Sequence, residues 1–211
     1  MQIYSSGVVA VIRRQRPEDV VHLAEALVKG GVTTLEITVD SDRSYHLIGE
    51  VKKRLGTTAL VGAGTVLDAE TAHTAIQAGA DFIFSPTFNI SLIEMAKRYG
   101  VISIPGVLTP SEMVEAYQAG ADLVKIFPAS AFGPSYIKDL QGPLGHISMI
   151  PTGGVTVENI GAYITNGAVA AGVGGSLVNQ KLIDNQDFES ITTLAEQFTE
   201  AVKKARTGSE S

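Results

Sequence analysis

Short apolar segments alternate with longer amphipathic segments along the whole chain. The short segments are rich in apolar and β-branched residues, which is typical of strands covered on both faces. They predict strands at residues 8–13, 33–39, 58–62, 81–85, 101–105, 122–127, 147–152 and 168–173. The stretches between them repeat apolar residues at helical spacing, most clearly at residues 17–29, 91–99 and 156–166. The chain is therefore predicted to alternate strands with helices.

The ends of several predicted helices are marked by residues with particular backbone preferences. Pro17 suits a first helical turn, and the pair Gly30-Gly31 is expected to end the same helix. The sequence TPSE, at residues 109–112, has the Thr-x-x-Glu spacing of a capping box, which starts another helix. Two related stretches, AGADFIFSP and AGADLVKIFP, each combine a helix end, a glycine turn and a strand. This echo supports a fold built from repeated strand–helix units.

Eight strand–helix units in 211 residues favour an α/β fold, a (β/α)8 TIM barrel at the small end of its size range. An open doubly wound sheet is the alternative. No linker or change in composition divides the chain, so we expect a single (β/α)8 domain over residues 1–206. Residues 207–211 are expected to form a disordered tail.

Composition and charge exclude several classes of function. The net charge is −6 and no dense basic patch occurs, so neither nucleic acid nor an anionic membrane is an expected partner. The chain has no cysteine, which excludes disulfides, thiolate chemistry and cysteine-ligated metals. The first residues lack the features of a signal peptide, and no apolar run approaches the length of a membrane span. We expect a cytoplasmic protein.

A lysine stands inside one of the predicted strands. Lys125 occupies the middle of the apolar run ADLVKIFPAS, and an ammonium group is costly to bury without a partner. In one interpretation Lys125 lies at a strand end, where it reaches water or pairs with a carboxylate. In the other, desolvation lowers its pKa and leaves a neutral, nucleophilic amine.

Glu36 is the carboxylate best placed to work with Lys125. Side chains alternate across a strand, so Glu36 and Thr38 share one face while Leu35 and Ile37 share the other. If the apolar face packs on helices, Glu36 and Lys125 point into the barrel from different strands. A buried salt bridge or a satisfied polar group in the core would explain Glu36 equally well. Together, however, the two residues supply an amine nucleophile and a carboxylate that can move protons.

Two glycine-bearing turns follow the last two predicted strands. They read IPTGGVT, from residue 150, and GVGGSLV, from residue 172. Phosphate sites of such barrels commonly lie after strands 7 and 8, where glycines let backbone N–H groups approach an anion and Thr152 and Ser176 offer hydroxyls. Each turn alone is explained as a plain tight turn. Their joint position predicts a phosphorylated ligand. The four histidines have no metal-ligand spacing, so no metal site is expected.

These motifs resemble those of one known family, the 2-keto-3-deoxy-6-phosphogluconate (KDPG) aldolases. The family includes the 4-hydroxy-2-oxoglutarate (KHG) and 2-dehydro-3-deoxy-6-phosphogalactonate aldolases. The resemblance covers roughly residues 7–200 and rests on motifs in the same order, namely LEIT, VGAGTV, SP, IPGVLTPSE, VKIFPAS, PTGG and GVGGS. It implies a class I aldolase on a (β/α)8 barrel that is a homotrimer and needs neither metal nor cofactor.

The resemblance also implies a role for each matching residue. Lys125 resembles the Schiff-base lysine, and Glu36 the general acid/base. The positions that match the pyruvate-binding part of the site are Thr65, Pro86 and Phe127. Those that match the phosphate-binding end are Thr152, Gly153, Gly154, Gly175 and Ser176.

The sequence departs from the family pattern at the position four residues beyond Glu36. Phosphogluconate enzymes often have a carboxylate-binding arginine there, whereas this chain has Asp40, which would repel a carboxylate. Arg13, at the end of the first strand in AVIR, resembles an arginine of the phosphogalactonate branch that can serve instead. The stretch FGPSYIK also resembles the phosphogalactonate branch, and SPTFN stands where the family more usually has an SPG turn. These features do not decide which sugar acid is the substrate.

The expected reaction is cleavage of KDPG to pyruvate and glyceraldehyde 3-phosphate, with KHG, which gives pyruvate and glyoxylate, as a further substrate. The phosphogalactonate isomer is the alternative substrate. Two other classes share the expected barrel and phosphate site, namely a phosphosugar isomerase or epimerase and a non-catalytic protein that binds a phosphorylated ligand. The pairing of Lys125 with Glu36 favours the lyase.

Overall fold

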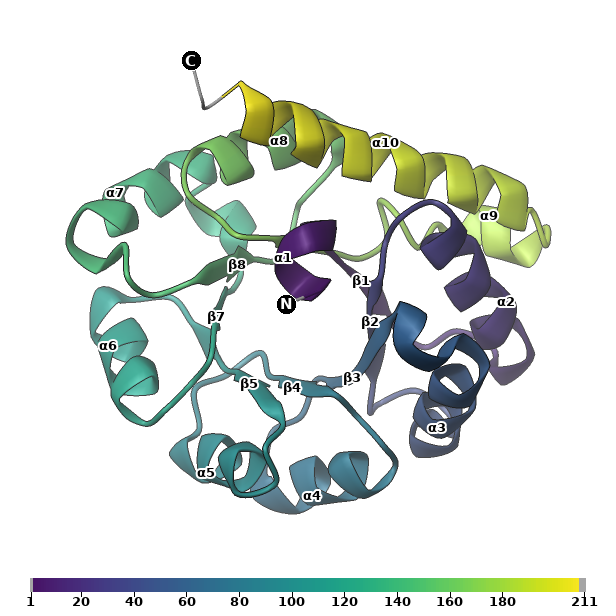
Figure 1. Ribbon diagram of the computed structural model, residues 1–211, viewed down its shortest axis with the longest axis horizontal. Helices are drawn as coiled ribbons and strands as arrows, with labels where there is room; N and C mark the ends of the chain where they lie inside the picture. The colour runs from purple at the N-terminus through teal and green to yellow at the C-terminus, as the bar shows by residue number, and fades with distance from the viewer. Residues whose placement is uncertain (1, 209–211) are drawn as a thin grey trace.

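The computed structural model describes residues 2–208, in which parallel strands curl around a common axis with helices outside them (Figure 1). The strands are β1 (Val8–Ile12), β2 (Thr34–Thr38), β3 (Leu60–Gly64), β4 (Phe82–Phe84), β5 (Ile102–Ile104), β6 (Gly106–Val107), β7 (Val124–Ile126), β8 (Met149–Pro151) and β9 (Ala171–Val173). The prediction of an α/β fold with parallel strands is confirmed.

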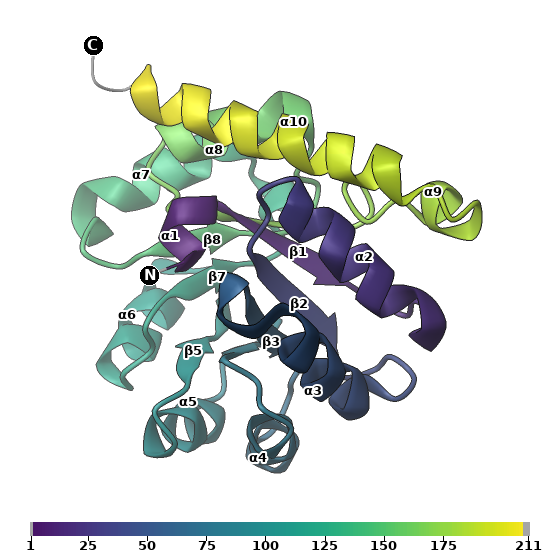
Figure 2. The same cartoon turned by 45° about the vertical axis from the view of Figure 1, so that its right-hand side comes forward.

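Most of the helices lie outside the strands and form the outer layer, whereas α1 lies across one end of the strands (Figure 2). They are α1 (Gln2–Ser6), α2 (Pro17–Lys29), α3 (Ser44–Leu55), α4 (Ala69–Gln77), α5 (Ile90–Arg98), α6 (Pro110–Gln118), α7 (Pro134–Leu144), α8 (Val157–Thr165), α9 (Gln180–Asp184) and α10 (Phe188–Thr207), with 3₁₀ turns at Gly56–Thr58 and Ala129–Ala131. Both halves of the predicted capping box form between Thr109 and Glu112. Within residues 2–208, no helix is both long and apolar enough to cross a membrane.

The strands form two parallel sheets. One has the order β5-β4-β3-β2-β1-β9, and the other β6-β7-β8. Pro105 alone separates β5 from β6, and β6 lies beyond the end of the strand predicted at residues 101–105. Proline cannot donate to a strand ladder, but its carbonyl accepts the Lys125 N–H at 2.8 Å. At the other junction, Thr152 after β8 forms a parallel bridge with Gly172 of β9.

Apolar side chains fill two separate regions. The larger lies between strands and helices and includes Leu35 and Ile37, which confirms that this face of β2 packs outward. The smaller lies inside the curled strands and includes Phe82, Phe84, Leu123 and Ile150. Helix α1, which the sequence pattern does not predict, adds Ile3 to this inner cluster at the end where the strands begin (Figures 1 and 2).

The chain end differs from the expectation in one respect. Helix α10 includes Thr207, the first residue of the segment predicted to be a disordered tail. Its N-cap is Asp187, whose side chain accepts the Ser190 N–H. Gly208 follows as the C-cap of this helix, and residues 209–211 of the predicted tail lie outside the described residues.

Candidate active site

Lys125 lies in β7 with its side chain directed into the region enclosed by the strands. It is 5% exposed, and its Nζ lies 4.3 Å from the ring centre of Phe84 and 4.9 Å from that of Phe127. Burial lowers the pKa of the Lys125 ammonium, the charge of Glu36 opposes that shift, and the charge of Arg13 adds to it. Of the two interpretations of Lys125 from the sequence, the structure therefore favours the desolvated, neutral amine over a lysine that reaches water.

Glu36 faces the same interior from β2. It is 1% exposed, and its Oε2 has no hydrogen-bond partner among the residues that the structure describes. Burial raises the pKa of the Glu36 carboxyl to about 7, although the charges of Lys125 and Arg13 act in the opposite direction. A carboxyl group with a pKa near neutrality can both accept and return a proton at physiological pH.

A glycine makes room for the Glu36 carboxylate. Glu36 pairs with Gly62 in the ladder between β2 and β3, and a Cβ added to Gly64, two residues further, would overlap the Glu36 side chain. Glycine is therefore required at position 64, because the Glu36 carboxylate lies so close to the backbone there that no larger residue leaves space for it. Neither this role of Gly64 nor the contact of Phe84 with Lys125 is predicted from the sequence.

We expect Gly64→Ala to displace the Glu36 carboxylate. Overpacking a filled interior costs about 1–3 kcal/mol of unfolding free energy, and aldol cleavage should fall by about tenfold or more as Glu36 moves. Thermal unfolding and kcat/KM measure the two effects. Gly142→Ala is the matched control, since a Cβ at Gly142 in α7 meets nothing within 4 Å. An active, fully stable Gly64→Ala variant would contradict this role of Gly64.

Arg13 and Thr65 meet at the ends of β1 and β3. The Arg13 Nη2 donates to the Thr65 Oγ1 at 2.6 Å. Thr65 has a φ of 59°, a left-handed conformation that is strained for a β-branched residue. This conformation presents the hydroxyl to the guanidinium. Arg13 is thereby held beside the cavity described next.

One cavity of about 360 Å³ brings the candidate residues together. The sequence-predicted residues that line it are Arg13, Glu36, Pro86, Lys125, Phe127, Thr152, Gly153, Gly154, Gly175 and Ser176. Thr65 does not line it and reaches it only through Arg13. The lining residues that sequence reasoning missed are Val11, Val155, Thr156, Gly172 and Gly174. Phe127 and Pro128 are joined by a cis peptide bond.

Both glycine turns contribute residues to the lining of this cavity. Gly153 and Gly154 have φ values of 101° and 72°, which favour glycine. A Cβ at Gly154 would also lie only 2.8 Å from the Ser130 Cβ. The Ser176 hydroxyl donates to the Val155 carbonyl at 2.6 Å, so it joins the two turns. Within residues 2–208, no group of three or more acidic or histidine side chains is arranged to hold a metal ion.

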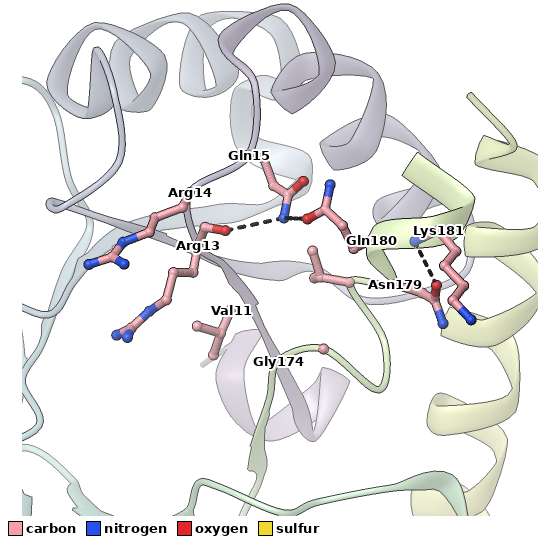
Figure 3. Close-up of a pocket in the computed structure, with 10 residues that line it drawn as sticks. Val11, Arg13, Arg14, Gln15, Gly174, Asn179, Gln180 and Lys181 are labelled. Atoms are coloured by element: carbon pink, nitrogen blue, oxygen red, sulfur yellow. Dashed lines mark hydrogen bonds between the residues drawn. The ribbon is translucent and has the colours of Figure 1, made fainter. Parts of the chain in front are cut away.

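A second cavity of about 630 Å³ adjoins the first and shares Val11, Arg13, Gly174 and Gly175 with it (Figure 3). It lies between the loop after β1 and the segment that leads into α9. The Gln15 side chain links the two parts of its lining, because its Nε2 donates to the Arg13 carbonyl at 3.1 Å and to the Gln180 Oε1 at 3.0 Å (Figure 3).

Asp40, which the sequence suggested would repel a carboxylate, is paired with a cation. Its Oδ2 accepts from the Arg14 Nε at 2.9 Å. Partial burial raises the pKa of Asp40, but a hydrogen bond with Thr38 and the charges of Arg13 and Arg14 outweigh it, so the pKa is lowered overall. Asp40 therefore stays ionised at neutral pH, with its charge opposed by the adjacent arginines.

Comparisons with known proteins show which family the chain belongs to. The sequence model of the family described as KDPG and KHG aldolase matches residues 2–194. The 2-dehydro-3-deoxy-phosphogluconate aldolase of Treponema pallidum (strain Nichols) is 34% identical over 196 residues, which cover 92% of this chain and 93% of the relative. The 2-dehydro-3-deoxy-6-phosphogalactonate aldolase of Escherichia coli (strain K12) is 34% identical over 198 residues, 93% of this chain and 95% of the relative.

A solved structure shows the same arrangement of the backbone. It is the KDPG aldolase from Legionella pneumophila, with pyruvate captured at low pH as a covalent carbinolamine intermediate. Its TM-score is 0.86 at 30% sequence identity, over 92% of this chain and 95% of that chain. The family match spans most of the sequence, and the curated relatives are matched over nearly their whole lengths. This chain belongs to the KDPG and KHG aldolase family.

Proposed function

We propose that this aldolase cleaves KDPG to pyruvate and glyceraldehyde 3-phosphate through a Schiff base on Lys125. One observation carries the proposal: the Lys125 amine is buried, its pKa is lowered by burial, and it shares a cavity with the Glu36 carboxyl. KHG is proposed as a further substrate. The phosphogalactonate isomer is the alternative, since relatives named for the two sugar acids are equally identical to this chain.

We further propose that the strands close into a (β/α)8 barrel. The support comes from the two junctions between the sheets. Counting β5 and β6 as one strand broken at Pro105 gives eight strands, and the bridge between Thr152 and Gly172 joins β8 to β9. In such a barrel the loops after the strands form one active face, which is where the cavity lies.

The first half of the reaction forms the iminium ion. The neutral Lys125 amine attacks C2 of the keto acid, and the C2 oxygen takes up a proton to give a carbinolamine. Glu36 supplies protons to that oxygen and removes them from the nitrogen, directly or through a water, until the oxygen leaves as water. Burial of Lys125 lowers the pKa of its ammonium and so favours the unprotonated amine beforehand.

The second half breaks the carbon–carbon bond. A base removes the proton of the C4 hydroxyl, C4 becomes the aldehyde carbon of glyceraldehyde 3-phosphate, and the electron pair of the C3–C4 bond flows into the iminium to give an enamine. The enamine then takes a proton at C3, and water hydrolyses the resulting pyruvate iminium to pyruvate and the free Lys125 amine. The cationic nitrogen lowers the barrier because it accepts this electron pair.

Different groups in the lining of the cavity are proposed to bind the two charged ends of the substrate. Arg13, held by Thr65, is proposed to bind the C1 carboxylate, while Pro86 and Phe127 form the walls near the keto group. The turn at Gly153 and Gly154 lines the same cavity. Together with Thr152, Gly175 and Ser176, it offers backbone N–H groups and hydroxyls to the phosphate.

Borohydride reduction in the presence of pyruvate tests this chemistry. A Schiff base with pyruvate is reduced to a stable secondary amine, so we expect a reduced pyruvyl group on the peptide that contains Lys125, found by mass spectrometry. Lys97, which pairs with Asp122 on the exterior, is an internal control that should stay unmodified. If no adduct forms on the folded protein, the isomerase or the non-catalytic binding protein becomes the better interpretation.

Kinetics with three substrates then decide among the acids. We expect the highest kcat/KM with KDPG, and a measurable value with KHG, which lacks the phosphate. A higher kcat/KM for the phosphogalactonate isomer would replace KDPG as the preferred substrate. Because the isomers share the carboxylate, keto group and phosphate, this comparison changes the named substrate without changing the mechanism.

We also propose a cytoplasmic homotrimer, as the family resemblance implies. Two exposed apolar side chains support an oligomer: Leu67, in the loop before α4, is 52% exposed, and Ile90, the first residue of α5, is 50% exposed. Asn89, the N-cap of α5, links the two positions by donating to the Leu67 carbonyl at 3.1 Å. Light scattering should give three times the chain mass of 22.2 kDa.

A further inference from the structure

The loop after β1 places two arginines next to each other with different surroundings. Arg13 lines both cavities and donates to Thr65. Arg14 donates through its Nε to Asp40, in the turn after β2. Figure 3 shows the two side chains leaving the end of β1 in succession. The direction of Arg13 therefore depends on how the backbone at Arg14 is held.

Arg14 is held at two points on the turn after β2. Its backbone N–H donates to the Ser41 Oγ at 2.8 Å, and its side chain is paired with Asp40 at 2.9 Å. The Ser41 Oγ is itself 3.0 Å from the Thr38 Oγ1 at the end of β2. Arg14 has a φ of 51°, which is unfavourable for a residue with a Cβ unless surrounding contacts maintain it. The two contacts to the turn supply that restraint.

The other side of the loop is fixed as well. Gln15 is 7% exposed, and its Nε2 holds the Arg13 carbonyl as well as Gln180 (Figure 3). Gln180 in turn donates to Asp184 at 2.9 Å. The backbone at Arg13 is thus fixed between α9 on one side and the turn after β2 on the other, and only its guanidinium extends over the cavity.

We propose that Arg14 and Asp40 form a positioning pair, which holds the loop after β1 so that Arg13 points to where the substrate carboxylate binds. The inference rests on the proposed function, because it presumes that Arg13 binds this carboxylate. Asp40 then aids the binding of an anion despite its own negative charge. Its effect through Arg14 and the loop outweighs its direct repulsion of the carboxylate.

The proposal and simple electrostatics predict opposite signs for one substitution. Under repulsion alone, Asp40→Asn removes a negative charge near the anion and should tighten pyruvate binding. Arg14→Gln removes a positive charge and should weaken it. For a positioning pair both substitutions weaken binding, because either one removes the same ion pair. Both residues are exposed in part, at 71% for the Arg14 side chain and 25% for that of Asp40, and such pairs add little to stability.

The test measures the pyruvate concentration that gives half-maximal trapping by borohydride. We expect this concentration to rise about five- to tenfold in Asp40→Asn and in Arg14→Gln, with the maximal rate of trapping nearly unchanged. The double variant should be no worse than either single variant, because both remove one interaction. Asp42→Asn is the matched control. It removes the same charge from an exposed residue of the same turn, and it should change the value less than about twofold.

A lower half-saturating concentration in Asp40→Asn would overturn the proposal and leave Asp40 as a repelling charge. An unchanged value in both single variants would overturn it too. If one variant fails to fold, as circular dichroism would show, the other still tests the same contact from the opposite side. Absence of any adduct in the parent protein would instead defeat the proposed function, so the two failures are distinguishable.

Discussion

Lys125→Ala is expected to lower aldol cleavage by at least roughly four orders of magnitude, because the variant has no amine to form the iminium. Without that cation, the electron pair released from the C3–C4 bond has no acceptor. The loss should appear in kcat, and pyruvate with borohydride should leave the variant unmodified. Near-normal cleavage by this variant would contradict the assignment of Lys125 as the nucleophile.

The composition of the chain allows a more demanding version of this experiment. The sequence has no cysteine, so Lys125→Cys introduces a single thiol. Alkylation with 2-bromoethylamine in mild denaturant, followed by refolding, converts that thiol into a side chain with an amine at nearly the position of Nζ. We expect the untreated variant to be inactive and the treated one to regain part of the cleavage activity and the pyruvate adduct.

The recovered fraction would separate chemistry from folding. A variant that is inactive because it is misfolded does not regain activity when one amine is added. The parent protein, which has no thiol to alkylate, is the control for damage by the reagent and the denaturant. Failure of the aminoethylated protein to form an adduct, while it folds normally, would show that an amine at this position is insufficient.

The periodicity of the sequence is enough to predict the elements and the directions of the main side chains. Lys125 and Glu36 lie on strands whose alternation separates an apolar outer face from an inner one, and the structure places Leu35 outside and Glu36 inside. This works because a side chain's face follows from its place in its own strand. The glycine turns are predictable for a similar reason, since left-handed backbone favours glycine.

Features that depend on neighbouring strands are not predicted. The contact of Gly64 with Glu36 follows from the ladder register between β2 and β3, which a single sequence does not reveal. The left-handed conformation of Thr65 breaks the usual residue preference. Asp40 illustrates the same limit, because its sequence position indicates repulsion of an anion, whereas its partner Arg14 comes from another loop.

Glu36→Gln should slow cleavage by about two to four orders of magnitude, the usual range for a positioned acid or base. Glutamine keeps the shape of the side chain but neither accepts nor returns a proton. Because the pKa of Glu36 is raised to about 7, the profile of kcat/KM against pH for the parent should contain an ionisation near 7. That ionisation should be missing in the variant. If the variant cleaves at the parental rate, another group or water moves the protons.

Glu36→Gln, which should slow cleavage, should also make the folded protein more stable above neutral pH. In the folded chain burial raises the pKa of Glu36 from 4.5 to about 7, so the folded state binds this proton more tightly than the unfolded state. The free energy of unfolding therefore falls as the pH rises from about 4.5 to about 7, by up to about 3 kcal/mol for a shift of this size.

Glutamine does not ionise, so Glu36→Gln should unfold at a higher temperature than the parent at pH 8 and at a similar one at pH 5. A variant that is slower in cleavage but more stable at pH 8 would identify Glu36 as a group kept for chemistry at a cost to folding. A variant less stable than the parent at pH 8 would show that the carboxylate is needed by the fold.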